Sequence, residues 1–522
     1  MTHAWVATET AAATANVADF LLAGKPPERI ALQFVERNYS YAELATASQG
    51  VASFCDQLGL RKGDRVVLIS DNSFFWVAVY LGLLRAGLVC VPLPPSLPAR
   101  VLDYVLHVTE ARLAAVQARY AVKNAASFCG MHLMTDSAIE SAQSFLSHSD
   151  MTDVSRRESS TPFPASEILP GDLAAIMFTS GSTGQPRGVM ISHRNITANT
   201  ESIIESLSLT EQDRTMAVLP FHYCFGTSLL HTHLRVGGSL VVDLRFMYPE
   251  VVLQRMQTTQ CTGFAGVPSH FQILLRRSKL AQRSFPALRY VQQAGGHLAP
   301  PFVRELREAL PQTQILLMYG QTEATARLSF LPAQELATRP GSIGKAIPGV
   351  TLRVVDDAGS EVPPGHPGEI VAEGENVALG YWRAPQETAA TFRHGKLHTG
   401  DIATVDSDGF LYIVDRAKDF LKCGGKRISC RQIEDQILEC RDLLEVAVVG
   451  VRDEVLGEAV GAFVVPRNPQ SGDAAAVVHA FCKQHLPPAL IPKKIVVLRS
   501  LPKNEAGKTL KQCLPSLRGQ SI

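Results

Sequence analysis

The sequence predicts an α/β protein with a β-rich part and a small α+β domain at its C-terminal end. Strand-like and helix-like patterns alternate from residue 30 to 116 and again beyond a glycine-rich loop at residues 178–189, which is typical of a mostly parallel sheet covered by helices. From about residue 341 to 415, short strand-like runs separated by Gly, Pro and Asp-Gly turns replace the helices. Beyond residue 415, helices and strands are mixed again.

The predicted elements can be placed in chain order. A capping box of Ser40 and Glu43 opens the first clear helix, and residues 74–84 form a buried helix that continues to Gly87. Residues 144–167 are rich in Ser, Thr, Asp and Pro and are predicted to be a surface connection. The predicted strands of the N-terminal part cover residues 30–34, 65–70, 88–92, 216–220, 239–242, 263–268, 290–292, 315–319, 352–355 and 368–371. The C-terminal domain is expected to contain a helix over residues 430–440 and strands over residues 445–449 and 462–465.

Length and composition limit the classes of function. A chain of 522 residues exceeds what one hydrophobic core can organise and indicates about two to four domains or subdomains. With 46% apolar and 19% charged residues, it has the composition of a globular protein. The formal net charge is +1, so the positive field that attracts nucleic acids or anionic membranes is missing, and we expect neither partner.

The termini and the cysteines predict a cytoplasmic protein. Residues 1–16 lack the basic and apolar regions of a signal peptide, and the longest apolar run, residues 74–84, is too short for a transmembrane segment. The ten cysteines are scattered without a Cys-x-x-Cys pair or a zinc-binding cluster, so we expect reduced thiols. Residues 519–522 match neither a peroxisomal signal nor a prenylation box.

The most informative segment is the loop at residues 178–189, Phe-Thr-Ser-Gly-Ser-Thr-Gly-Gln-Pro-Arg-Gly-Val, between two apolar runs. Its glycines, hydroxyl side chains and backbone N–H groups are suited to bind a polyanion, and a triphosphate is the expected ligand. It is not the P-loop of common NTPases, because Pro186 stands where that motif needs glycine and no Gly-Lys-Ser/Thr follows. The same composition also fits a plain surface hairpin, an alternative that the loop alone leaves open.

Three further segments carry groups that suit a nucleotide. Residues 319–325, Tyr-Gly-Gln-Thr-Glu-Ala-Thr, offer an aromatic ring, hydroxyl donors and one carboxylate suited to Mg²⁺ beside phosphates. Asp401 ends a predicted strand, where it can accept hydrogen bonds from ribose hydroxyls, and Arg416 can reach the same sugar. Residues 501–509 form a glycine-hinged loop that presents Lys508. Taken singly, these segments also fit a capped turn, a surface ion pair and a solvated lysine.

Together and in this order, the four segments resemble the adenylate-forming superfamily of acyl- and aryl-CoA synthetases, peptide-synthetase adenylation domains and beetle luciferases. The resemblance runs from about residue 28 to about residue 512, because residues 41–44, 63–66 and 87–92 also match. It implies an N-terminal AMP-binding domain over residues 1–415, made of two stacked αβαβα-type subdomains and a small β-barrel-like subdomain. A mobile α+β domain over residues 416–522 is expected to follow and to carry the catalytic lysine.

The resemblance also implies roles for individual residues. The residues expected to bind the ATP phosphates are Thr179, Ser180, Gly181, Ser182, Thr183, Gly184 and Arg187. Those expected around adenine and ribose are Gly295, Gly296, Tyr319, Asp401 and Arg416. The expected catalytic residues are Thr322 at the α-phosphate, Glu323 as the Mg²⁺ ligand, and Lys508. Lys418 is the expected hinge, Gly424, Gly425 and Lys426 the expected thiolation loop, and His222, Tyr223, Phe225 and Gly226 the expected acyl pocket.

Two positions depart from the family pattern. Arg187 stands where the family usually has lysine. The positive charge is kept, but the compact ammonium group is replaced by a planar guanidinium with several N–H donors. We expect this change to tune pyrophosphate release rather than to abolish activity. His297 replaces a third small residue after Gly295 and Gly296.

The function that the resemblance implies is ATP-dependent activation of a carboxylic acid to an acyl-adenylate, followed by transfer to the thiol of coenzyme A. ATP, Mg²⁺ and coenzyme A are the expected cofactors. Residues 221–226 contain three aromatic residues and no Asp to pair with an ammonium, so the expected acid is aryl or medium-chain aliphatic and lacks an α-amino group. Two alternatives stay open: transfer to the phosphopantetheine of an acyl carrier protein, and a nucleotide-binding scaffold without turnover.

Overall fold

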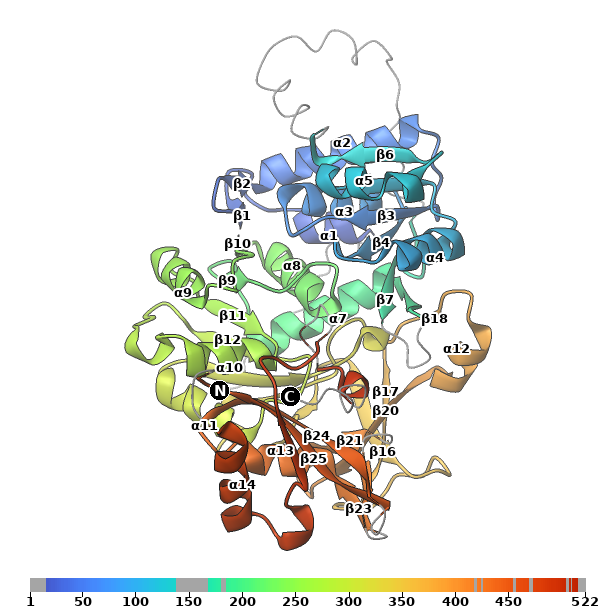
Figure 1. Ribbon diagram of the computed structural model, residues 1–522. Coiled ribbons are helices and arrows are strands. Elements are labelled where there is room, and N and C mark those ends of the chain that lie inside the picture. The colour runs from blue at the N-terminus through green and yellow to red at the C-terminus, as the bar shows by residue number, and fades with distance from the viewer. Residues whose placement is uncertain are drawn as a thin grey trace, which may run out of the picture.

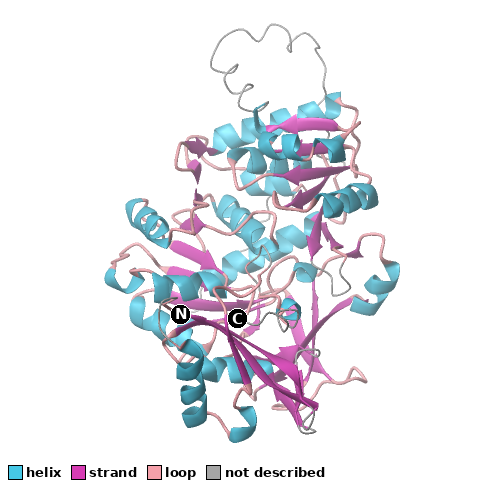
Figure 2. Cartoon of the chain, viewed as in Figure 1, coloured by secondary structure: helices cyan, strands magenta, loops and turns pink. Residues whose placement is uncertain are grey.

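The computed structural model describes residues 16–137, 168–179, 185–416, 420–423, 426–453, 457–468, 473–503, 507 and 509–514. Two large sheets with their helices form the upper and middle parts of the molecule in Figure 1, and two smaller sheets lie below them. Figure 2 shows that helices separate the upper sheet from the middle one. The predicted fold class is confirmed, because a large mixed α/β N-terminal domain is followed by a small C-terminal domain.

The upper sheet has the strand order β18-β8-β7-β4-β3-β5-β6. Its strands are β3 (Arg65–Ile69), β4 (Val89–Leu93), β5 (Leu113–Val116), β6 (His132–Thr135), β7 (Leu173–Thr179), β8 (Arg187–Ser192) and β18 (Gly380–Tyr381). β3 to β7 pair in parallel, whereas β7 and β8 are antiparallel and form the base of the glycine-rich loop. Helices α4 (Ala99–Thr109) and α5 (Ala118–Lys123) cover one face through apolar side chains.

The middle sheet has the order β15-β14-β13-β12-β11-β9-β10-β1-β2. Its strands are β1 (Ile30–Gln33), β2 (Asn38–Ser40), β9 (Arg214–Ala217), β10 (Ser239–Val242), β11 (Gly263–Gly266), β12 (Tyr290–Gln293), β13 (Gln314–Tyr319), β14 (Ser329–Leu331) and β15 (Lys345–Ala346). The strands from β1 to β13 within this order are parallel. Helices α9 (Pro249–Thr258), α10 (Pro268–Arg277) and α11 (Pro300–Ala309) pack on one face.

The largest core lies between these two sheets. It includes residues of both sheets and of helices α1 (Val17–Leu22), α2 (Tyr41–Gln57), α3 (Phe74–Arg85), α7 (His193–Leu207) and α8 (Cys224–Val236). Helix α3 is buried on nearly all sides, which explains why its sequence is apolar all round rather than amphipathic. The predicted capping box is present, with Ser40 accepting from the Glu43 backbone at the start of α2.

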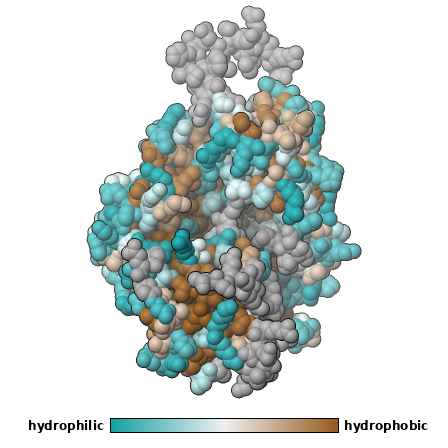
Figure 3. Space-filling model, in the orientation of Figure 1, coloured by the Kyte–Doolittle hydropathy of each residue, from teal (hydrophilic) through white to brown (hydrophobic). Residues whose placement is uncertain are grey.

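The β-rich part and the C-terminal domain complete the molecule. The β-rich part contains β16 (Val350–Val355), β17 (Gly368–Gly374), α12 (Pro385–Thr391), β19 (Phe392–Arg393), β20 (Lys396–Val405) and β21 (Leu411–Arg416). The C-terminal domain contains β22 (Phe420–Cys423), β23 (Lys426–Ser429), α13 (Cys430–Ile437), β24 (Leu443–Asp453), β25 (Gly457–Pro466), α14 (Ala474–His485) and β26 (Lys494–Val497). Apolar surface gathers over β24 and β25 on the face shown in Figure 3.

The two faces of the C-terminal sheet are covered differently. Helices α13 and α14 pack on one face. Leu501 and Leu514 join a second cluster with Ala447 of β24 and Phe463 of β25. Because Leu501 and Leu514 are both anchored on the sheet, the segment between them is fixed at its two ends.

Most predicted elements are found within a few residues of their expected bounds. The strand predicted at residues 216–220 is shifted to Arg214–Ala217, because the carbonyl of Pro220 already accepts from the Tyr223 N–H in a turn that leads to α8. The predicted surface connection at residues 144–167 lies outside the described residues. Of the helices in the described ranges, none combines the length and apolarity that a membrane crossing requires. The domain limits at residues 415 and 416 stay a prediction.

Two helical glycines provide a matched test of the packing between α2 and α3. A Cβ at Gly82 would lie 2.5 Å from Val51 Cβ and 2.7 Å from the Ser48 carbonyl oxygen, whereas a Cβ at Gly50 meets no atom within 4 Å. Overpacking costs about 1–3 kcal/mol, so Gly82→Ala should lower the midpoint of thermal unfolding. Gly50→Ala should raise the free energy of unfolding by about 0.5–1 kcal/mol. Equal midpoints for the two variants would contradict this packing.

Candidate functional site

The glycine-rich loop joins two neighbouring strands, so its two ends lie close together. β7 ends at Thr179 and β8 begins at Arg187, and these two residues are paired in the antiparallel register. The guanidinium carbon of Arg187 lies 5.6 Å from the centre of the Tyr381 ring. The five predicted phosphate-binding residues inside the loop lie outside the described residues: Ser180, Gly181, Ser182, Thr183 and Gly184.

Tyr381 connects this loop to the segment that carries Glu323. The Tyr381 hydroxyl donates a hydrogen bond of 2.8 Å to Glu323 Oε1, and its backbone pairs with Val189 of β8. Burial and the Glu323 carboxylate raise the pKa of Tyr381, so the phenol keeps the proton that it donates. No motif pointed to Tyr381, because its importance comes from a contact between two distant segments.

A sharp turn follows β13 and positions Thr322. A Cβ at Gly320 would lie 2.0 Å from the carbonyl oxygen of Ala326, so glycine is required for this close approach. The 3₁₀ helix η4 (Thr322–Ala324) begins directly after the turn. Thr322 is buried, and its hydroxyl donates a hydrogen bond of 3.4 Å to Cys224 Sγ. The turn therefore brings Thr322 to the start of α8.

Tyr319 and Asp401 meet although they belong to different sheets. The Tyr319 hydroxyl donates a hydrogen bond of 2.8 Å to Asp401 Oδ2, and both residues are buried. Asp401 in β20 is paired with Arg416 in β21. Three of the five residues predicted for adenine and ribose are thus linked to one another, although the side chain of Arg416 is not among those described.

The predicted Gly-Gly turn lies against residues of the predicted acyl pocket. Gly295 has a φ of +81°, and a Cβ there would lie 2.9 Å from Val267 Cγ1 and 3.3 Å from the Tyr223 hydroxyl. Gly296 is tied to β12, because its carbonyl accepts a hydrogen bond of 2.8 Å from Gln293 Nε2. The turn therefore leaves no room for a side chain at Gly295.

The other predicted acyl-pocket residues lie at or just before the start of α8, and His222 is half-buried there. Burial lowers the pKa of His222 to about 4, so its imidazole is neutral at physiological pH. Phe225 is buried, and Gly226 is packed so closely on Pro220 that a Cβ would lie 2.0 Å from the Pro220 carbonyl oxygen.

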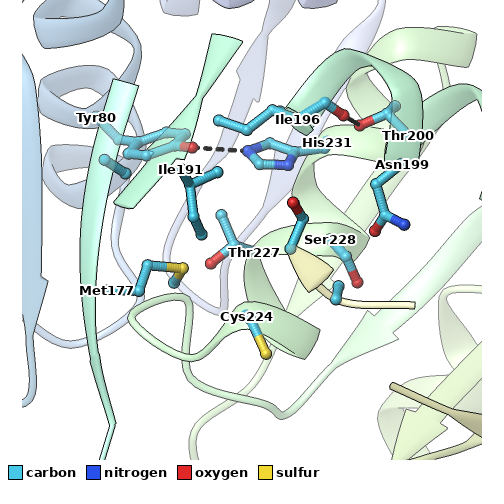
Figure 4. Close-up of a pocket in the computed structure, with 13 residues that line it drawn as sticks. Tyr80, Met177, Ile191, Ile196, Asn199, Thr200, Cys224, Thr227, Ser228 and His231 are labelled. Carbon is cyan, nitrogen blue, oxygen red and sulfur yellow. Dashed lines mark hydrogen bonds between the residues drawn. The ribbon is translucent and has the colours of Figure 1, made fainter. Parts of the chain in front are cut away.

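A small cavity lies on another side of α8. Figure 4 shows apolar side chains of β7 and β8 on one side and polar side chains of α7 and α8 on the other. The apolar residues include Met177 and Ile191, and the polar residues include Asn199, Thr227, Ser228 and His231.

One hydrogen bond joins two residues that line this cavity. The Tyr80 hydroxyl and His231 Nε2 are 2.8 Å apart (Figure 4). Burial lowers the pKa of His231 to about 3, so the imidazole is neutral. Sequence reasoning missed these residues, because a helix buried on all sides gives no pattern that marks the side facing a cavity.

The loop that carries Lys508 approaches the N-terminal domain. A Cβ at Gly507 would lie 2.9 Å from Val267 Cγ2 and 3.1 Å from Ser269 Oγ. Val267 also contacts the turn at Gly295, so one apolar side chain touches both segments. Lys508 itself lies outside the described residues, as do Lys418, Gly424 and Gly425, and the side chain of Lys426 is not described.

His297 links the Gly-Gly turn to α13 of the C-terminal domain. Its Nε2 lies 2.8 Å from Asp435 Oδ1, and its Nδ1 accepts a hydrogen bond from Arg431. This arrangement requires the neutral imidazole, in which only Nε2 carries a proton. Burial lowers the pKa of His297, the Arg431 charge adds to this effect, and Asp435 opposes it.

Arg276 forms a second polar link between the domains. The guanidinium pairs with Glu305 of α11 over 2.6 Å. It also donates to the carbonyl oxygens of Leu438 and Leu443 in the C-terminal domain. Hydrogen bonds of arginine and histidine side chains thus join the two domains, and Leu438 and Val446 add apolar contacts to the core of the middle sheet.

Comparisons with known proteins agree with this geometry. The family model described as AMP-binding enzyme matches residues 22–382, and the model described as AMP-binding enzyme C-terminal domain matches residues 432–508. A long-chain-fatty-acid–CoA ligase of Escherichia coli O6:H1 is 30% identical, with 91% of this chain and 89% of the relative covered. An oxalate–CoA ligase of Arabidopsis thaliana is 29% identical, with 93% and 95% covered.

Solved structures show the same relationship. The crystal structure of the anthranilate CoA ligase AuaEII in complex with anthranoyl-AMP has a TM-score of 0.85 and 25% sequence identity, with 96% of each chain covered. The predicted enzyme class, an AMP-forming acid–thiol ligase, is confirmed by these comparisons. With a matched family model over most of its length, the chain belongs to the AMP-binding enzyme family.

Proposed function

We propose that this enzyme uses ATP to activate a carboxylic acid as an acyl-adenylate and then transfers the acyl group to the thiol of coenzyme A. One observation carries the proposal: four segments that are far apart in the sequence converge. Tyr381 links the glycine-rich loop to Glu323, and Tyr319 hydrogen-bonds to Asp401. The loop that carries Lys508 approaches the same region through Gly507.

The residues present suit ATP and Mg²⁺. The ends of the glycine-rich loop at Thr179 and Arg187 would hold the β- and γ-phosphates, and Asp401 with Arg416 would hold the ribose. Thr322 would donate to the α-phosphate. Mg²⁺ in nucleotide sites is usually held by one or two carboxylates together with phosphate oxygens, and Glu323 would supply such a carboxylate. Bound there, the ion would neutralise charge on the leaving pyrophosphate.

The first half-reaction forms a mixed anhydride. A carboxylate oxygen attacks the α-phosphorus, the bond to the bridging oxygen of pyrophosphate breaks, and pyrophosphate leaves. Lys508 would bridge the carboxylate and the α-phosphate, where negative charge is crowded in the transition state. The contact between Gly507 and Val267 supports this role, because Val267 also touches the turn at Gly295.

The second half-reaction needs a different set of groups. The thiol attacks the acyl carbon, the thioester bond forms, and AMP leaves. We propose domains at residues 1–415 and 416–522, with a hinge at Lys418 that withdraws Lys508 and brings Gly424, Gly425 and Lys426 to the adenylate. The polar links through His297 and Arg276 fit such a motion, because water can replace hydrogen bonds that break when the domain turns.

The acid is proposed to be aryl or medium-chain aliphatic and to lack an α-amino group. The relatives are named for a long-chain fatty acid, oxalate and anthranilate, so their names leave the acid of this chain open. The small cavity beside Cys224 is lined by both apolar and polar side chains, so its lining does not narrow the choice of acid. The residues of the predicted acyl pocket, His222, Tyr223, Phe225 and Gly226, bring no carboxylate to pair with an ammonium.

A carrier-protein phosphopantetheine is the alternative acceptor. AMP release measured with free coenzyme A and with a holo-carrier protein separates the two acceptors. A cytoplasmic location stays a prediction.

Acid-dependent exchange of pyrophosphate into ATP tests the proposed function. The wild-type enzyme should support exchange with at least one acid that lacks an α-amino group. Lys508→Ala should lower this exchange by on the order of 100- to 1,000-fold, because its charge acts mainly in the first transition state. Thioester formation from synthetic acyl-adenylate should change by only about threefold, as expected for a residue withdrawn in that step.

Two outcomes contradict this account. No exchange with any acid in a broad panel would exclude the enzymatic activity and favour a nucleotide-binding scaffold. An equal loss of both half-reactions in Lys508→Ala would refute the role of the lysine.

The link through His297 should make the domain contact sensitive to acid. The folded protein needs the neutral imidazole, whereas an unfolded histidine becomes charged below about pH 6.5. Stability from this contact is therefore complete above that pH and is lost as the pH falls towards the lowered pKa of His297. Between pH 7.5 and 5.5, thermal unfolding of the wild type should shift more than that of His297→Gln. Identical shifts in the two proteins would show that His297 does not couple pH to the domain contact.

A further inference from the structure

Arg327 is a buried cation outside every motif of the sequence analysis. It follows η4 and precedes β14, and the residue is only 2% exposed. Burial lowers the pKa of Arg327 to about 10, so the guanidinium still carries its charge at neutral pH. Arginine is almost never buried so completely unless a partner compensates its charge.

None of the described residues supplies a counter-charge to this guanidinium. Within the described ranges of the chain, no carboxylate forms an ion pair with Arg327, and its Nη2 has no hydrogen-bond partner. Nη1 contacts the thioether sulfur of Met318, which is a weak acceptor. The centre of the Phe225 ring lies 5.2 Å from the guanidinium carbon, and this face-on contact is weaker than an ion pair. The charge of Arg327 is therefore unbalanced in the absence of a ligand.

Arg276 is buried to a similar extent, but its charge is compensated by other residues of the protein. It is 3% exposed and pairs with Glu305 and with the carbonyl oxygens of Leu438 and Leu443. A buried charge that lacks such partners is strongly unfavourable, so a residue like Arg327 is expected to serve a ligand.

The guanidinium lies at the wall of the predicted acyl pocket. Its charge acts on the Tyr223 phenol and the Cys224 thiol, and Cys224 in turn accepts the hydrogen bond from Thr322. The backbone N–H of Arg327 donates to Asn199 Oδ1 over 3.3 Å, and Asn199 lines the cavity of Figure 4. The guanidinium of Arg327 therefore lies against Phe225 at the start of α8, and the two residues that precede it in the chain, Thr325 and Ala326, line the cavity.

We propose that the acid activated by this enzyme carries a second carboxylate, and that this carboxylate pairs with Arg327. The proposal rests on the proposed function, because it names the substrate class of the same site. The reacting carboxylate becomes an anhydride and then a thioester, so it loses its charge, whereas a carboxylate at the other end of the acid keeps its charge throughout. The planar guanidinium can donate two parallel N–H bonds to such a group.

The same geometry disfavours other acids. An α-amino acid would bring an ammonium group close to the uncompensated charge of Arg327. A plain fatty or aryl acid would leave the guanidinium without a partner. A dicarboxylic acid supplies the anion that the described residues lack.

Pairs of acids in the pyrophosphate-exchange assay test this proposal. Each pair consists of a dicarboxylic acid (oxalic, malonic, succinic, glutaric, adipic or phthalic acid) and its monomethyl ester, and matched monocarboxylic acids are included. We expect at least one diacid to exceed its own ester in kcat/KM by on the order of 100-fold, because the ester leaves a buried charged donor unpaired.

The outcomes separate this proposal from the proposed function. If the kcat/KM for the esters or the plain monocarboxylic acids equalled or exceeded that for every diacid, the proposal of a second carboxylate would be wrong. The proposed ligase activity would still stand. Absence of exchange with all acids would overturn both.

Two substitutions of Arg327 test the residue itself. Arg327→Met removes the charge and should abolish the preference for the diacid over its ester, with the KM for ATP unchanged. This variant should melt no lower than the wild type, because an unpaired buried charge is lost. Arg327→Lys keeps the charge without the fork and should retain part of the preference.

Arg235→Met is the matched control. Arg235 also lies over a phenylalanine ring, 4.3 Å from the centre of Phe20, and it belongs to the same helix as Cys224, but it pairs with Glu201 at the surface. It should keep the diacid preference. If Arg327→Met raised the KM for ATP and kept the diacid preference, the guanidinium would serve the nucleotide and the proposal would be wrong.

Discussion

The hydrogen bond from Tyr381 to Glu323 holds the carboxylate on which the proposed ATP site depends. Tyr381 is paired through its backbone with β8, the strand that leaves the glycine-rich loop, and Arg187 at the start of β8 lies against the same ring. A hydrogen bond to a charged group contributes about 1.5–3 kcal/mol, which is enough to keep one orientation of Glu323 dominant. The phenol remains a donor because burial and Glu323 raise the pKa of Tyr381. The start of β8, η4 and β18 are thus linked to one another.

The contact between the two domains differs from the apolar core that joins the two large sheets. The links through Arg276 and His297 are polar, and Leu438 and Val446 also pack against the apolar core of the middle sheet. By contrast, the core between the two large sheets is apolar and continuous, which suits a rigid platform. We propose that the C-terminal domain turns against this platform between the two half-reactions.

The sequence predicted the fold class and the family well, because both depend on local patterns. The alternation of strands and helices, the capping box at Ser40 and the turn at Gly320 are all encoded within short segments. Tyr381 and Arg327 could not be found in this way. Neither residue belongs to a recognisable motif in its own segment. Only the folded chain shows that Tyr381 donates a hydrogen bond to Glu323 and that Nη2 of Arg327 has no hydrogen-bond partner among the described residues.

The acyl side of the site was also only partly predictable. The motif indicated residues 222–226, whereas the cavity is lined by Cys224 and by later residues of α8 such as Thr227 and His231. Because α8 is buried on nearly all sides, its sequence does not reveal which side faces the cavity. The role of His297 depends in the same way on α13, which approaches it only through the C-terminal domain.

Isotope transfer from the acid to AMP tests the central claim most directly. The enzyme is incubated with ATP, coenzyme A and an acid whose carboxylate carries ¹⁸O, and the AMP and pyrophosphate are analysed by mass spectrometry. The account predicts one ¹⁸O atom in each AMP molecule and none in pyrophosphate, because a carboxylate oxygen attacks the α-phosphorus and stays with AMP when the thiol takes the acyl group. Unlabelled AMP, or label in pyrophosphate, would contradict the acyl-adenylate.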